Sequence, residues 1–222
     1  MPLPRPGYVA GVGRERLTFD GWIAAVGTGS GTRVVLGHWP RSPFGPFNDV
    51  MLEHADGRRL LLAPTARIAE CIAGIYHFDG VRIVPVSVHR WGTEWAVTAG
   101  PLELRFAVGR RGALGLALRA VPRTLARRPA WAAFTDGPAR LLPGVRTRGS
   151  SRPGCRQWYA ACDLRRITTA AASFDGADLG PPAPVDPPVR FGFASAPARP
   201  ALVRVVTTVE RDGAGPHGVT GA

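Results

Sequence analysis

Few side chains in this sequence are spaced for metal binding or for nucleophilic catalysis. Cys155 and Cys162 have six residues between them, and no histidine lies within fifty residues of either. The paired cysteines of a structural zinc site usually have about two to four residues between them, so we predict neither a metal site nor a cofactor. Cys71 shares one face of an expected helix with three isoleucines. We interpret it as a core residue, because a nucleophile would need exposure and a neighbouring base.

Two charged residues interrupt apolar strand faces, and they are the main candidates for a ligand site. Glu53 is expected to share its face with apolar residues on its own strand and across a hairpin, namely Met51, Leu60 and Leu62. Arg82 is expected to share its face with the valines at 84, 86 and 88. Burying either charge unpaired costs on the order of several kcal/mol, so we predict that both point into one cavity, paired with each other or across a ligand. The alternative is that each lies near a strand end and extends its charge into water.

Three further residues complete the candidate ligand site. His54 lies beside the Asp56-Gly57 turn, and Tyr76 and His77 follow an expected helix. The histidines can meet only through tertiary folding. For His77, an interaction with the C-terminal end of the helix dipole is the alternative.

Arginine dominates the charge of the chain. All 28 basic residues are arginine, and the formal net charge is +12. Thirteen arginines and two acids lie between Gly109 and Arg166, so this segment carries nearly all of the excess. Without lysine, neither a Schiff base nor a lysine general base can form. No arrangement of residues in the sequence indicates a particular reaction, so we assign no catalytic residue.

The arginine-rich segment indicates an alternative function, binding of nucleic acid or of an anionic surface. Arg119, Arg123 and Arg127 recur every four residues on an expected helix. Further along, basic and aromatic residues are interleaved, at Arg146, Arg148, Arg156, Trp158 and Tyr159. Bases can stack on such rings while phosphates pair with the guanidinium groups, and a basic helix face also suits an anionic membrane surface. A solvated surface is the competing interpretation, because no known nucleic-acid-binding motif is present.

Turn residues between apolar runs predict a protein made mostly of hairpins. Residues 49–55 and 58–63 are expected to pair around Asp56-Gly57, and residues 95–99 and 102–108 around Gly100-Pro101. In the second hairpin, Trp95 should lie opposite Phe106 on the core face, and Arg105 should lie on the other face. The glycine-rich loop 27–31 is interpreted as a hairpin loop, because a strand follows it and not the helix that a phosphate cradle needs.

The remaining elements are assigned from periodicity and from proline. Further strands are expected at 22–26, 33–37, 81–89, 167–174, 189–194 and 202–210, and residues 141–157 should be mostly loop. Helices are expected at 65–76, directly after Pro64, and at 114–127, where Pro122 should kink or end the first half.

Together these elements predict an α+β protein, a mostly antiparallel β-barrel or strongly curved sheet with two helices. Closure or curvature is expected because many open strand edges would aggregate. We predict one barrel-like domain over residues 18–210 with an arginine-rich helical insert at 109–166. A flexible arm at 1–17 and a disordered tail at 211–222 are expected to flank it.

The order of a hairpin, a helix, a strand ending in VRIVPVSV, a second hairpin and a basic insert resembles that of uncharacterised proteins of high-GC bacteria. In layout it is also similar to the acetoacetate-decarboxylase-like barrel group, whose members enclose a small-molecule cavity. Decarboxylases of that group use a Schiff-base lysine, and this chain has no lysine. The resemblance therefore implies a ligand cavity without decarboxylation by that route.

The function that we predict is binding of a small anionic or carboxylate-bearing molecule inside a β-barrel. No run of apolar residues is long enough for a transmembrane helix. The N-terminus lacks the apolar region of a signal peptide, so a cytoplasmic protein is expected.

Overall fold

The computed structural model describes residues 14–121, 148–192 and 197–212 of the chain. Ten strands form the main sheet: β1 (Arg14–Thr28), β2 (Arg33–Arg41), β3 (Phe47–Glu53), β4 (Arg59–Ala63), β5 (Gly80–Ile83), β6 (Val86–Trp91), β7 (Glu94–Ala99), β8 (Leu102–Val108), β10 (Cys155–Phe174) and β13 (Ala201–Asp212). The other elements are α1 (Ala66–Ile75), α2 (Ala113–Ala120), β9 (Arg148–Gly149), β11 (Ala177–Asp178) and β12 (Pro182–Ala183). Neither of these helices is long and apolar enough to cross a membrane.

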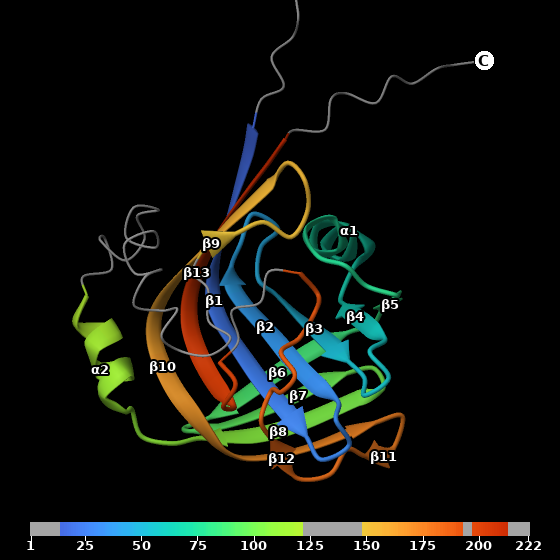
Figure 1. Ribbon diagram of the computed structural model, residues 1–222, viewed down its shortest axis with the longest axis vertical. Helices are drawn as coiled ribbons and strands as arrows, with labels where there is room; N and C mark the ends of the chain where they lie inside the picture. Colours follow the sequence, from blue (N-terminus) through green and yellow to red (C-terminus); the bar gives the residue numbers. More distant parts are fainter. Residues whose placement is uncertain (1–13, 122–147, 193–196, 213–222) are drawn as a thin grey trace, which may run out of the picture.

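The main sheet is strongly curled, as Figure 1 shows, and this confirms the predicted α+β class. Its strands follow the order β5-β4-β3-β2-β1-β13-β10-β8-β7-β6. The β6 end of this path returns to β3, where the side-chain amide of Asn48 donates to the backbone oxygen of Val86 on β6, at 3.0 Å. The result is a half-barrel in which β13, the last strand, lies between β1 and β10.

The two hairpins predicted from turn residues are confirmed. In the first, β3 and β4 pair around the Asp56-Gly57 turn. In the second, Trp95 lies opposite Phe106 and Ala96 lies opposite Arg105, with the expected faces. The glycine-rich loop at 27–31 is also a hairpin loop, between β1 and β2. These features are local, so turn chemistry and alternation were sufficient to predict them.

Four element predictions are wrong. The expected strand at 81–89 is divided into β5 and β6 at Pro85, which has no N–H for a strand ladder. The segment 155–166 is the first half of the twenty-residue strand β10, and not part of a helical insert. No strand forms at 189–192. Finally, β1 already begins at Arg14 and β13 ends at Asp212, so the sheet includes residues assigned to the arm and the tail.

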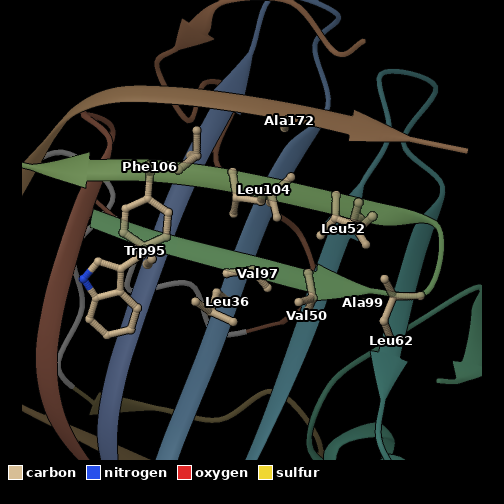
Figure 2. Packing of buried hydrophobic residues seen from close by; sticks show 14 of the residues in the cluster. Leu36, Val50, Leu52, Leu62, Trp95, Val97, Ala99, Leu104, Phe106 and Ala172 are labelled. Carbon is tan, nitrogen blue, oxygen red and sulfur yellow. The ribbon is translucent and has the colours of Figure 1, made fainter. Parts of the chain in front are cut away.

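The first core lies inside the curl of the sheet. Strand alternation turns Leu36, Val50 and Leu52 toward β7 and β8, where Figure 2 shows them facing Val97 and Leu104. All five of these side chains are buried. The inner face is therefore a continuous apolar layer that ends at Trp95 and its neighbour Trp22.

The second core lies on the opposite face of strands β1 to β4 and β13, under α1. The helix begins after Thr65, whose side-chain oxygen accepts from the Ile68 backbone N–H, and it buries Ile68, Ile72 and Ile75 against that face. Residues 185–191 extend the same cover over β1 and β2 through Val185, Val189 and Phe191. The two faces thus enclose two separate interiors.

Candidate functional site

Glu53 is fully buried, but it does not face the apolar core that the sequence suggested. The observed register pairs Glu53 with Arg59 and Met51 with Leu61, so the expected neighbours Leu60 and Leu62 lie on the other face. The Glu53 carboxylate forms ion pairs of 2.9 Å with Arg33 and with Arg190. The backbone N–H of Arg190 donates to its second oxygen at 2.6 Å. All the donors that Glu53 needs thus come from the chain itself.

Arg82 lies on the opposite side of the sheet from Glu53, in solvent. Its side chain is 49% exposed, 3.8 Å from the Asp175 carboxylate, and its guanidinium lies 5.7 Å from the Phe174 ring centroid. The parallel pairing of β4 with β5 places it opposite Leu62, on the face of the first core. The prediction of a cavity shared with Glu53 is therefore wrong, because a one-residue slip in register exchanges the faces of a strand.

The other candidate ligand residues are divided between two places. His54 packs edge-on against Phe174, at a centroid distance of 5.1 Å, near Arg82. The Tyr76 hydroxyl hydrogen bonds to the Tyr159 hydroxyl, and His77 Nε2 lies 3.2 Å from the Ser151 carbonyl oxygen. The described contacts do not join these two groups.

The basic and aromatic residues of β10 are separated by strand alternation. Arg156 is exposed and Trp158 is half-buried, whereas Tyr159 points to the opposite face and is buried. Arg119 lies in the last turn of α2. For Arg148, only the backbone in β9 is described, and Arg123, Arg127 and Arg146 lie outside the described residues. The proposed stacking surface therefore loses Tyr159, and the alternative function stays a prediction.

A pocket of about 270 Å³ lies where the first core ends, between the inner face of the sheet and α2. Trp22 and Trp95 form its apolar side, with ring centroids 6.3 Å apart. Five arginines and two aspartates also line it: Arg90, Arg111, Arg119, Arg165, Arg204, Asp20 and Asp163. The pocket thus combines an aromatic surface with an excess of three positive charges.

The two aspartates are already paired. Asp20 forms ion pairs with Arg41 and Arg204, and Asp163 accepts from Arg111 Nε at 2.9 Å. Burial tends to raise the pKa of Asp20, but the hydrogen bonds and charges of Arg204 and Arg41 outweigh burial and hold its pKa below the ordinary value. Asp20 is therefore ionised at neutral pH and holds Arg204 at the pocket wall.

Arg90 differs from these arginines because no acid among the described residues pairs with it. Its guanidinium lies 4.9 Å from the Trp95 ring centroid and 5.3 Å from that of Trp22. Arg204 also lies over Trp22, at 4.3 Å. Such cation–π contacts hold a guanidinium in place but leave its charge uncompensated, so its N–H groups can still bind an anion.

His38 supports the tryptophans from the core side without adding charge. Its ring lies 5.5 Å from both Trp22 and Trp95. Because the Asn48 amide nitrogen donates to Val86, the Asn48 oxygen is left to accept from His38 Nδ1, at 2.6 Å. Burial lowers the pKa of His38, and the charges of Arg90 and Arg204 lower it further. The imidazole is therefore neutral at neutral pH.

Our sequence reasoning missed most of this pocket. Arg204 interrupts the apolar face formed by Leu202 and Val206, which is the same pattern that singled out Glu53 and Arg82, and it could have been found. Arg90 and Trp22 carry no such signal, since Arg90 lies near the end of β6 and Trp22 contacts residues from distant segments of the chain. Among the described residues, no group of three or more histidines, cysteines and acids could hold a metal ion.

The fold and the pocket define a curled, mostly antiparallel α+β sheet with an arginine- and tryptophan-lined cavity at the end of its core. No protein-family model and no curated protein matches the sequence. Among solved structures, an acetoacetate decarboxylase from Legionella pneumophila is similar at a TM-score of 0.39 and 11% identity, over 96% of this chain and 90% of that chain.

A second solved structure, a protein of Nitrosomonas europaea assigned as AttH, is similar at a TM-score of 0.26 and 10% identity. The similarity covers 91% of this chain and 53% of that chain, so the chain spans about half of its length. Likenesses at these TM-scores carry no argument about the activity of this chain.

Proposed function

We propose that this protein binds a small anionic molecule, with a carboxylate or phosphate group beside an apolar or aromatic part, in the pocket between Trp22, Arg90 and Arg204. The observation that carries the proposal is the position of Arg90 over two tryptophans with no acid among its described contacts. A guanidinium presents several N–H donors in a fixed plane that matches carboxylate and phosphate oxygens. The tryptophan rings supply the apolar contact area.

The other unpaired arginines support an anion rather than a neutral ligand. Arg165 donates to the backbone oxygens of Gly109 and Val108, at 2.9 and 3.3 Å, and no acid among the described residues neutralises it or Arg119. A volume of about 270 Å³ lies near the lower end of ligand pockets, roughly 300–1,000 Å³. The ligand that we propose is therefore a small metabolite-sized anion.

Binding of matched probes to an Arg90→Gln variant tests this proposal. Benzoate and phenyl phosphate supply an anion on a planar ring, and benzyl alcohol is the uncharged match for both. We expect Arg90→Gln to weaken anion binding about tenfold or more, because a hydrogen bond to a charged group contributes about 1.5–3 kcal/mol. Isothermal titration calorimetry at low salt measures the effect.

The control variant is Arg156→Gln, which removes an equal charge from an exposed position on β10 outside the pocket. It should bind benzoate as the wild type does. Equal affinity of benzoate and benzyl alcohol, or equal losses in the two variants, would contradict an anion site at Arg90.

The position of α2 offers a second test. Gly115 lies so close to β10 that an added Cβ would be 2.2 Å from the backbone oxygen of Leu164. Gly115→Ala must therefore push α2 away from the sheet, together with Arg119 and the nearby Arg111. We expect benzoate affinity to fall roughly tenfold, which corresponds to the loss of about one charge-assisted hydrogen bond. The same calorimetry measures this change.

Gly112→Ala is the matched control for this helix. Gly112 precedes α2 with an ordinary φ of −80°, and an added Cβ there would meet nothing within 4 Å. It should keep wild-type affinity. A Gly115→Ala protein that binds benzoate as tightly as Gly112→Ala would show that α2 contributes nothing to binding.

A further inference from the structure

A second cavity, of about 50 Å³, lies in the other interior, between the sheet and α1. Its walls are mainly apolar and aromatic, from Phe19, Trp39, Phe47, Ile72 and Ile75. Four polar side chains also line it, and they come from four different elements: Asp49, Tyr76, Tyr159 and Thr207. A polar group in such surroundings needs a partner, because burying it without a hydrogen bond is costly.

Asp49 is a buried acid, and no arginine of the described segments pairs with it. The other two buried acids of the described chain, Asp20 and Glu53, are each paired with two arginines. The Asp49 carboxyl, 3% exposed, accepts one described hydrogen bond, from Trp39 Nε1 at 2.9 Å. Although the chain has 28 arginines, this carboxyl has no counter-ion among the described residues.

Thr207 gives a second, independent indication that the cavity binds a polar ligand. Its side chain is 4% exposed, and its Oγ1 has no hydrogen-bond partner. Tyr76 lines the same cavity. Asp49, Thr207 and Tyr76 thus bring three side chains with oxygen acceptors to one largely aromatic cavity.

We propose that this cavity binds a small primary ammonium ion, with the Asp49 carboxylate as counter-ion and the hydroxyls of Thr207 and Tyr76 as further acceptors. An ammonium group has three N–H donors and no acceptor, which matches three oxygen acceptors. The rings of Phe19, Trp39 and Phe47 favour a cation through their π faces. A water-sized group needs roughly 10–15 Å³ of such a cavity, so methylammonium and ethylammonium fit and hexylammonium does not.

A cation is favoured over a neutral ligand because, when the site is empty, the Asp49 carboxylate binds a proton instead of the cation. Burial raises the pKa of Asp49 to about 7, although the Trp39 hydrogen bond acts in the lowering direction. The groups that face Asp49 from α1 and β10 stay neutral near pH 7, since burial also raises the pKa of Cys71, Cys155, Tyr76 and Tyr159. Arg211, near the end of β13, and Glu15, near the start of β1, are charged, and they pair with each other.

The proton and the ammonium ion should therefore compete. Because the folded pKa of Asp49 is raised above its unfolded value, its contribution to stability is present below about pH 4 and is lost as pH rises to about 7. Ammonium binding has the opposite pH dependence, since it needs the ionised carboxylate. An alkylammonium ion stays charged throughout, as its pKa resembles that of lysine, about 10.4.

The test is a titration of the full chain with ethylammonium chloride, followed by the NMR signal of the Trp39 indole N–H, with sodium chloride holding the ionic strength constant. We expect saturable binding at pH 8.5 and an apparent Kd about a hundredfold higher at pH 5, two units below the Asp49 pKa. Ethanol, which has the same size and no charge, should not bind, and hexylammonium should not bind.

Variants separate this site from the anion pocket. Asp49→Asn keeps an acceptor for Trp39 but removes the charge, so ethylammonium affinity should fall at least tenfold and lose its pH dependence. Thr207→Val should weaken binding severalfold, and Arg90→Gln should leave it unchanged. Ethanol binding as tightly as ethylammonium, or an ethylammonium Kd that is equal at pH 5 and 8.5, would overturn the proposal. If Asp49→Asn does not fold, the wild-type pH series and Thr207→Val still decide.

Discussion

Replacing Trp95 with alanine is expected to lower the free energy of unfolding by about 3–5 kcal/mol, the usual range for truncating a large buried aromatic side chain. Trp95 is 3% exposed and stacks on Phe106 at a centroid distance of 5.7 Å. It also contacts Trp22 and His38, so its removal opens a void between the first core and the anion pocket. Urea denaturation followed by circular dichroism measures the loss.

Arg105→Ala is the control, because it changes the same hairpin on the other face. Arg105 lies opposite Ala96 and is exposed, and surface substitutions usually change stability by less than about 0.5 kcal/mol. Similar denaturation midpoints for Trp95→Ala and Arg105→Ala would show that the hairpin does not pack as described.

A loss of similar size, about 3–5 kcal/mol, is expected for Glu53→Ala, because it leaves a buried arginine without a counter-ion. The Arg33 side chain is 5% exposed, and its Nε has no hydrogen-bond partner even with Glu53 present. Replacing both Glu53 and Arg33 by leucine should cost much less than the single change, since no buried charge then remains without a partner. Guanidinium chloride denaturation of the wild type, Glu53→Leu, Arg33→Leu and the double leucine variant gives the coupling energy.

Arg190→Ala is the matched control for Glu53. Arg190 contacts the same carboxylate, but its side chain is 67% exposed, and exposed ion pairs contribute about 0–1 kcal/mol. A Glu53→Ala protein that is no less stable than Arg190→Ala would mean that water reaches this ion pair.

The sequence was sufficient where structure depends on near neighbours. The β7–β8 hairpin was predicted with its register and faces, because one turn and clean alternation specify both. At the β3–β4 hairpin the strands were correct but the register was not, so Glu53 was assigned to the wrong face. The length of β10 was hidden because its arginines, and the polar but buried Gln157, obscure the alternation of buried residues at Cys155, Gln157 and Tyr159. Strand propensity alone cannot correct these errors in register and strand length, because they depend on which residues the folded protein buries.

The two sites were beyond prediction from one sequence. The anion pocket draws on β1, β6, β7, β10, β13 and α2, and the cavity under α1 draws on five strands and a helix. Trp22 and Arg90 are 68 positions apart in the chain, and they meet because the sheet curls. Asp49 shows the limit most clearly. Its importance is that no arginine in the described part of the chain lies beside it, and this can be seen only in three dimensions.

The place of β13 has a consequence for how the protein is made. The strands before it in the chain form two groups, β1 to β5 and β6 to β10, and β13 joins them by pairing with β1 on one side and β10 on the other. A ribosome completes β1 long before residues 201–212 exist. During that interval the nascent chain exposes two long unpaired strand edges, which invite pairing with other chains. Folding yield in cells should therefore depend on chaperones that occupy these edges until synthesis reaches the last strand.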